Sequence, residues 1–218
     1  MIQAVIFDCD GVLVDSETYS CGAWLPVLAR RGVSTDLDEI ETFIGRSDAA
    51  LLHHFAAQGA PDWNPEEILA EREAAYFSAA AGNLQPFPGL AAQLEDLRRG
   101  GFELAVASSG TPRKIAFNLE EAGFPAFFPV VCSAVEVQAG KPAPDLFLLA
   151  AERLGVKPSA CCVIEDSVPG LQGAVAAGMR ALGFTSSHPA NVLVDAGAHG
   201  VFSTFDELGP LIGKNSRD

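Results

Sequence analysis

Two acidic residues, Asp8 and Asp10, follow a short apolar segment that runs from Ile2 to Phe7. Such a segment predicts a buried β-strand, so both acids lie where a strand ends and a loop begins. Side chains at positions i and i+2 of an extended chain point to the same face, so both carboxyl groups can enter one crevice. Burying two like charges together costs free energy unless a cation neutralises them or the two groups divide the roles of acid and base between them. The pair therefore indicates acid–base chemistry, cation binding or both.

Three later segments also place reactive side chains beside apolar ones. They are Ser108-Ser109-Gly110 after Leu104–Ala107, Gly140-Lys141-Pro142, and Glu165-Asp166 after Cys161–Ile164. In open α/β sheets, ligands bind at the carboxyl ends of the strands. We therefore expect these groups to meet Asp8 and Asp10 at one edge of a sheet.

The elements that must position these residues alternate between short apolar segments and helical patterns, which predicts an α/β fold with a parallel sheet. The predicted strands are Ile2–Phe7, Leu104–Ala107, Val130–Cys132, Cys161–Ile164, Ala181–Gly183 and Gly200–Phe202. The sequence of residues 16–85 shows no convincing strand pattern. It predicts three helices, each ending near a glycine, at Thr18–Arg31, Asp48–Gln58 and Pro65–Ala80. We expect a core domain of residues 1–15 and 86–218 and a helical insert of residues 16–85.

The four reactive segments resemble, in order, the four motifs of the haloacid dehalogenase-like (HAD) superfamily. Asp8-x-Asp10-Gly11 resembles the first motif, and the other three segments resemble the second, third and fourth. The resemblance covers nearly the whole chain. It implies a Rossmann-like parallel sheet core with an inserted α-helical cap domain that opens and closes over the active site. It also implies that Asp8 is a nucleophile and that Asp10 is a general acid and base.

The resemblance further implies Mg2+-dependent phosphoryl transfer through an aspartyl-phosphate. The expected metal ligands are the Asp8 carboxylate, the Asp10 backbone carbonyl and Asp166, with Glu165 as a further candidate. A hard cation of this kind would let the Asp8 carboxylate meet an anionic phosphate ester.

The expected phosphate-binding groups come from the second and third motifs. Lys141 would neutralise Asp8 and the transferring phosphoryl group, and the Ser108 hydroxyl would act with backbone N–H groups near Ser109 and Gly110. In the helical insert, Arg46 is the candidate for contacting the rest of the substrate.

Each of these residues also has a structural alternative. A strand-end acid often serves only as a turn or N-cap residue, and Ser108 could cap a helix that Thr111 and Pro112 indicate nearby. Lys141 could be an exposed loop residue. A capping role would not require two acids that face one crevice. We therefore prefer the functional interpretation for the four reactive segments.

Departures from family patterns favour a phosphatase. Asp10 argues against a dehalogenase, and the absence of any Lys before Lys114 argues against a phosphonatase. Ser20 stands where β-phosphoglucomutases have a cap His, which argues against a mutase, and we keep the mutase as the alternative. The first motif resembles the sugar-phosphate phosphatases of the β-phosphoglucomutase-like subgroup, including 6-phosphogluconate phosphatases. A catalytically inactive phosphosugar-binding regulator is a third hypothesis.

Composition restricts the partners. The net charge is −14 and the isoelectric point is about 4.6, which disfavours nucleic acid and anionic membranes as partners. No apolar stretch approaches the ~20 residues that span a bilayer. The five cysteines form no Cys-x-x-Cys pair, which favours reduced thiols in a cytoplasmic protein. We expect a monomer or weak dimer that binds a small phosphate ester.

Overall fold

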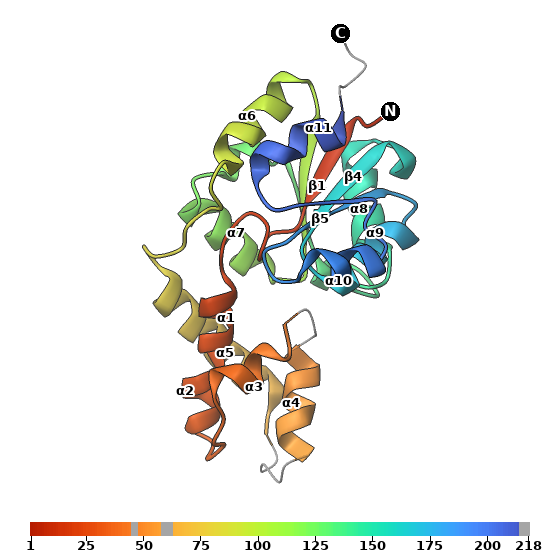
Figure 1. Cartoon of the computed structure of the whole chain (residues 1–218). Coiled ribbons are helices and arrows are strands. Elements are labelled where there is room, and N and C mark those ends of the chain that lie inside the picture. The colour runs from red at the N-terminus through yellow and green to blue at the C-terminus, as the bar shows by residue number, and fades with distance from the viewer. Residues whose placement is uncertain (45–47, 58–62, 214–218) are drawn as a thin grey trace. The chain divides into compact units, whose positions relative to one another are not determined.

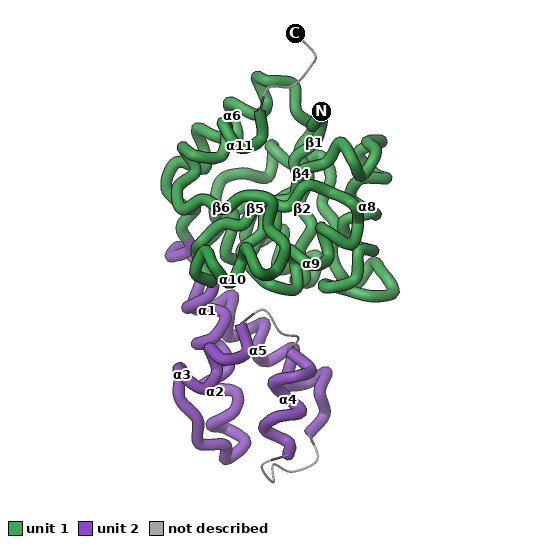
Figure 2. The backbone as a smooth tube through the Cα atoms, turned by 45° about the vertical axis from the view of Figure 1, so that its right-hand side comes forward, with its two compact units in different colours: residues 1–15, 85–218 green, residues 16–84 purple. Residues whose placement is uncertain are grey.

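The computed structural model describes residues 1–44, 48–57 and 63–213. The chain forms two compact units, shown in different colours in Figure 2. Unit 1 comprises Met1–Asp15 and Gln85–Asp218, and unit 2 comprises Ser16–Leu84. The chain leaves unit 1 after Asp15 and re-enters it at Gln85. These two residues are neighbours in unit 1, where the Asp15 N–H donates to the Gln85 carbonyl at 3.1 Å.

Unit 1 is built on a sheet of six parallel strands in the order β3-β2-β1-β4-β5-β6. Figure 1 labels β1, β4 and β5 of this sheet. The strands are β1 (Ala4–Phe7), β2 (Glu103–Ser108), β3 (Val130–Ser133), β4 (Cys161–Glu165), β5 (Arg180–Phe184) and β6 (Gly200–Phe202). Each predicted strand is present, with ends that differ by at most two residues. The predicted α/β fold class is confirmed.

The helices of unit 1 lie between these strands in the chain, except for the last one, which follows β6. They are α6 (Leu90–Arg99), α7 (Pro112–Glu121), α8 (Asp145–Leu154), α9 (Val168–Ala176), α10 (Ala190–Asp195) and α11 (Leu208–Ile212). Short 3-10 helices lie at η1 (Pro125–Phe127), η2 (Ala134–Glu136), η3 (Pro158–Ala160) and η4 (Phe205–Glu207). None of the described helices combines the length and apolar character needed to cross a membrane.

Strand β1 is buried on both faces, as expected for a strand inside a parallel sheet. Ala4 and Ile6 belong to a buried cluster that includes Phe147 of α8 and Leu171 of α9. The alternate residue Phe7 contacts Phe128, with ring centroids 5.8 Å apart. Packing on both faces fixes the strand, and so fixes the position of the acids that follow it.

The regular secondary structure among the described residues of unit 2 is helical only. Its helices are α1 (Glu17–Gly22), α2 (Trp24–Ala29), α3 (Leu37–Glu41), α4 (Asp48–Ala57) and α5 (Pro65–Ala80). They enclose a core of apolar side chains that includes Trp24, Leu28, Phe55 and Ile68.

The sequence prediction for unit 2 is wrong in two places. The expected single helix over residues 18–31 is two helices, because Pro26 lacks the N–H that would bond to the Gly22 carbonyl and its ring crowds that carbonyl. Helix α3 was not predicted, although the Asp36 side chain accepts a bond from the Glu39 N–H at 2.9 Å. The spacing Asp36-x-x-Glu39 was the signal for this helix start.

Candidate active site

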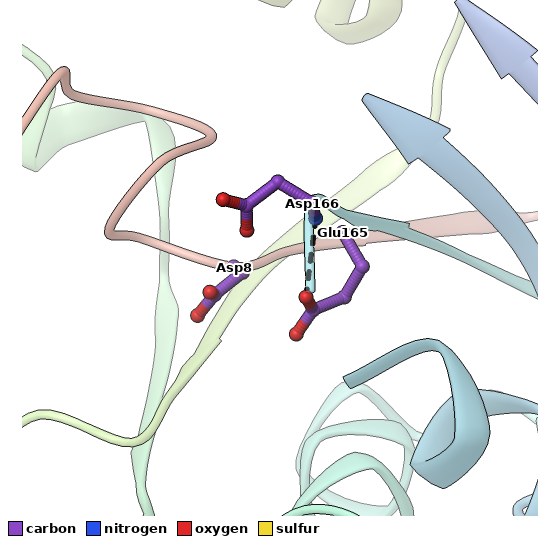
Figure 3. Close-up of side chains that lie close together, drawn as sticks. All are labelled: Asp8, Glu165 and Asp166. Atoms are coloured by element: carbon purple, nitrogen blue, oxygen red, sulfur yellow. Dashed lines mark hydrogen bonds between the residues drawn. The ribbon is translucent and has the colours of Figure 1, made fainter. Parts of the chain in front are cut away.

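Three buried acidic side chains meet at the carboxyl ends of β1 and β4. Phe7 pairs with Ile164 in the parallel register, so Asp8 leaves one strand beside the end of the other, where Glu165 and Asp166 lie. A carboxylate oxygen from each lies within 4.8 Å of the others. Figure 3 shows these three side chains close together. The structure thus brings together three of the predicted metal ligands.

Lys141 is the cation of this cluster. Its Nζ lies 2.8 Å from Asp8 Oδ1 and 2.5 Å from Glu165 Oε1, and its side chain is only 5% exposed. Burial alone would lower the pKa of Lys141, but the charges of Asp8 and Glu165 outweigh burial and raise it. Lys141 therefore stays an ammonium ion, and the alternative of an exposed loop lysine is wrong.

Asp8 is a buried carboxyl group whose charged form is disfavoured. Burial raises the pKa of Asp8 to about 7, with Lys141 opposing the rise and the charge of Glu165 adding to it. One ammonium ion is shared by two of three buried carboxylates, so the local charge is negative. Hard oxygen ligands with a surplus of negative charge are a donor set that suits Mg2+. The residues present therefore fit the predicted metal.

Glu165 is held differently from the other two acids. Its Oε2 accepts bonds from the Asp166 N–H at 3.2 Å, the Ser167 N–H at 3.1 Å and the Ser167 hydroxyl at 2.9 Å. A Cβ on Gly170 would lie 1.9 Å from the carboxyl carbon, so helix α9 can approach only because this residue is glycine. Glu165 thus joins Lys141 to the start of α9.

Asp166 lies against the loop that follows β1. Its Oδ2 accepts bonds from the Ser187 hydroxyl and, at 3.4 Å, from the Ser186 hydroxyl, which also donates to the Gly11 carbonyl at 2.5 Å. Gly11 has a φ of +74°, and a Cβ there would lie 2.1 Å from Asp166 Oδ2. Sequence reasoning missed both serines. The only available signal was their place after a predicted strand.

Asp10 contacts two residues of α7 that the sequence analysis did not assign. Lys114 Nζ lies 2.8 Å from Asp10 Oδ1, and Asn118 Nδ2 donates to the same oxygen at 3.1 Å. Both partners are buried, at 7% and 0% exposure. Their i, i+4 spacing after the predicted helix start was a usable signal, because such residues share one helix face.

Ser108 ends β2, next to β1, and is 1% exposed. Its Oγ accepts a bond from the Gly110 N–H at 3.1 Å, while the Gly110 carbonyl accepts from the Ser133 hydroxyl at 2.6 Å. Thr111, not Ser108, is the N-cap of α7, so the capping alternative for Ser108 is wrong. Ser109 is exposed beside it.

The described arginines of unit 2 contact other groups of that unit. Arg30 and Arg31 form ion pairs with Glu71 at 3.1 and 2.8 Å. Arg72 donates to the Ser20 hydroxyl at 2.8 Å, and its Nη1 lies 3.8 Å from Asp48 Oδ2. Arg46, the predicted specificity residue, lies outside the described residues.

Comparison with known proteins finds a matching family, related proteins and similar solved structures. Residues 2–178 match a family described as "haloacid dehalogenase-like hydrolase". The chain is 35% identical to "Protein SUPPRESSOR OF QUENCHING 1, chloroplastic" of Arabidopsis thaliana, over 90% of this chain but only 19% of that protein. It is 32% identical to "Fructose-1-phosphate phosphatase YqaB" of Escherichia coli, over 82% of this chain and 94% of that protein. A crystal structure of a "putative beta-phosphoglucomutase from Thermotoga maritima" matches with a TM-score of 0.78 and 27% identity, covering 97% of this chain and 98% of that one.

Proposed function

Because the chain belongs to the haloacid dehalogenase-like hydrolase family, we propose that it is a Mg2+-dependent phosphatase that hydrolyses a small sugar or sugar-acid phosphate through an aspartyl-phosphate. The predicted family and the predicted enzyme class, a phosphoric monoester hydrolase, are confirmed. The metal, the covalent intermediate and the substrate are the parts that we propose.

The observation that carries this proposal is the Lys141 bridge between Asp8 and Glu165. A carboxylate can attack an anionic phosphate ester only if positive charge offsets the repulsion. Lys141 supplies that charge at the oxygen of Asp8, and Glu165 fixes the ammonium group from the other side. A purely structural bridge would not require a third buried acid, Asp166, within reach of the other two.

The reaction then has two steps. An Asp8 oxygen bonds to phosphorus while the bond from phosphorus to the ester oxygen breaks, and the ester oxygen takes the proton of the Asp10 carboxyl group. A water oxygen next bonds to phosphorus while the bond to Asp8 breaks, its electron pair returns to the carboxylate, and Asp10 takes the proton of the water. The net change is ester plus water to alcohol plus phosphate.

Mg2+ would be held by Asp8, the Asp10 backbone carbonyl and Asp166. Glu165 is better suited to position Lys141, because its two oxygens already contact that ammonium group and the start of α9. When bound, the metal would neutralise charge on the phosphoryl oxygens.

The phosphoryl oxygens would bind at the end of β2 and the start of α7. The Ser108 hydroxyl lies there, with the backbone N–H groups near Ser109 and Gly110. N–H groups at a helix start point toward an anion and carry partial positive charge. Lys141 would complete the neutralisation.

Unit 2 is our proposal for the cap domain, with boundaries near residues 16 and 85. We propose a sugar phosphate as substrate because a relative of similar length is named a fructose-1-phosphate phosphatase. Arg46 remains the residue that we expect to contact the non-reacting part of the substrate.

The test is phosphate release from a panel of sugar phosphates, sugar-acid phosphates and p-nitrophenyl phosphate in the presence of Mg2+. We expect turnover by the parent, none by Asp8→Asn, and unchanged turnover by Asp15→Asn, which removes an exposed acid of the same segment. Mass spectrometry after an acid quench should find the phosphoryl group on the peptide with Asp8. Activity of Asp8→Asn within about tenfold of the parent, a loss of only ~1.4 kcal/mol in barrier stabilisation, would refute the covalent mechanism.

A β-phosphoglucomutase-type mutase is the alternative, and the likeness to the Thermotoga structure supports it. A mutase must bind a second phosphate while it excludes water from the aspartyl-phosphate. Ser20 lies at the position of the controlling His, and its hydroxyl is bonded to Arg72. Incubation with β-glucose 1-phosphate, Mg2+ and a trace of bisphosphate, followed by phosphorus NMR, decides between them. Glucose 6-phosphate formation faster than phosphate release would establish the mutase.

A further inference from the structure

Helix α7 presents two buried polar side chains to the proposed general acid. Lys114 and Asn118 lie one turn apart on the same face, and both contact Oδ1 of Asp10, at 2.8 and 3.1 Å. They are separated from Asp10 by more than 100 residues of sequence. Neither belongs to the motifs that the sequence analysis assigned.

The position of Lys114 is unfavourable for a lysine on local grounds. It lies in the first turn of α7, where its own N–H donates to the Thr111 hydroxyl at 3.2 Å. A cation at a helix start is opposed by the helix dipole, and a buried ammonium group loses its hydration. The contact with Asp10 offsets both effects, so the location of Lys114 depends on the carboxylate that it meets.

We infer that Lys114 and Asn118 are positioning residues that hold Asp10 for proton transfer to and from the substrate, an inference that rests on the proposed phosphatase function. Two donors on Oδ1 restrict rotation of the carboxyl group. They also make Oδ1 the accepting oxygen, so that in the acid form the proton is carried by Oδ2. When the Oδ2–H bond breaks and the ester oxygen takes the proton, the Lys114 ammonium group faces the carboxylate that remains.

Leaving-group dependence separates this role from a structural one. A nitrophenolate leaves without protonation, whereas an alkoxide needs the proton of Asp10. The ratio kcat/KM covers the steps up to formation of the aspartyl-phosphate, so it is unaffected by later water attack. A positioning role therefore predicts a loss that is large for an alkyl phosphate and small for an aryl phosphate.

The experiment compares glycerol 1-phosphate, or the best sugar phosphate of the panel, with p-nitrophenyl phosphate. For Lys114→Met and for Asn118→Leu, we expect kcat/KM to fall by at least about tenfold on the alkyl ester and by less than about threefold on the aryl ester. The inhibition constant of inorganic phosphate should stay within about twofold, because phosphate binding is not the role assigned. Arg113→Met, which removes an exposed cation from the same turn, should change neither ester.

Asp10→Asn provides the reference. It should show the same leaving-group pattern, and adding Lys114→Met to it should cause no further loss, because the two changes act through one group. An equal loss on both esters, or a weaker phosphate inhibition constant, would overturn the inference while leaving the phosphatase intact. If Asp10→Asn itself affects both esters equally, the acid role of Asp10 fails and the inference fails with it. A parent enzyme that releases no phosphate from any ester would refute the proposed function.

Discussion

Lys141→Met should destabilise unit 1 strongly, because it removes the cation shared by two buried carboxylates. The side chains of Asp8 and Glu165 are only 10% and 0% exposed in these ion pairs. Removing one partner of a buried ion pair costs about 3–5 kcal/mol. Protonation of a carboxyl group limits that cost. Because the pKa of Asp8 is already raised to about 7, this group takes up a proton at pH 7 with little further cost. The expected loss is therefore ~3 kcal/mol, the lower end of that range.

A second substitution should rescue the fold without rescuing turnover. Glu165→Gln keeps an oxygen for the three donors that contact Oε2 and removes one of the two stranded charges. The double variant Lys141→Met/Glu165→Gln should therefore recover more than half of the lost stability. It should stay inactive, because Asp8 still lacks its cation.

The assay is urea unfolding at pH 7 with a metal chelator, followed by far-UV circular dichroism. Both tryptophans, Trp24 and Trp63, lie in unit 2, so tryptophan fluorescence reports on that unit and not on the site. Lys157→Met, which removes an exposed lysine of unit 1, should cost less than about 0.5 kcal/mol. A loss below about 1 kcal/mol for Lys141→Met, or a double variant no more stable than the single one, would show that the bridge is not the electrostatic centre of the site.

Three further predictions concern the metal, the pKa of Asp8 and the substrate. Asp166→Ala should weaken Mg2+ activation by at least about tenfold, and it should raise the stability of the metal-free protein because like-charge repulsion is relieved. Titration calorimetry with Mg2+ measures the first effect and urea unfolding measures the second. An unchanged Mg2+ affinity would show that Asp166 is not a metal ligand. Without metal, the free energy of unfolding should fall as pH rises from about 4 to 7, by up to about 1.4 kcal/mol per pH unit. The reason is that the pKa of Asp8 in the folded protein is about 7, so the folded protein retains a proton that the unfolded chain releases. Asp8→Asn should remove that part of the slope, and an identical slope in the variant would contradict the raised pKa. Arg46→Ala should raise KM for the preferred sugar phosphate more than for p-nitrophenyl phosphate, and an equal change on both would exclude a contact with the sugar.

The sequence was sufficient to predict the sheet and the residues at its edge. Strand β1 is buried on both faces, so its residues are continuously apolar, and the acids that follow it stand out. The resemblance to the HAD motifs predicted Asp8, Glu165 and Asp166 as metal ligands of one site, and the parallel register of the structure places Asp8 beside the end of β4, where the other two lie. The α/β prediction succeeded because it depended on local patterns.

The partners of these acids could not be predicted in the same way. Lys114 reaches Asp10 because α7 follows β2, the neighbour of β1 in the sheet, although the whole of unit 2 intervenes in the sequence. Ser187 reaches Asp166 across 21 residues of helix and strand, and no spacing rule connects them. Such contacts are set by the order of strands in the sheet and by the angle at which each helix packs. The sequence contains this information only through the packing of the whole core.

The environment of Asp8 is consistent with a site selected for reaction rather than for stability. Three carboxylates are buried with one ammonium group between two of them, and burial raises the pKa of Asp8 to about 7. In the absence of ligands this arrangement opposes folding, since each excess negative charge lacks water and a counterion. The same excess becomes favourable interaction energy when a divalent cation is bound, because the cation replaces the missing counter-charge. Two glycines are needed for this geometry, since a side chain at Gly11 would displace Asp166 and one at Gly170 would displace Glu165. Backbone and charge therefore support the same proposal, that this edge of the sheet binds a metal and a phosphoryl group.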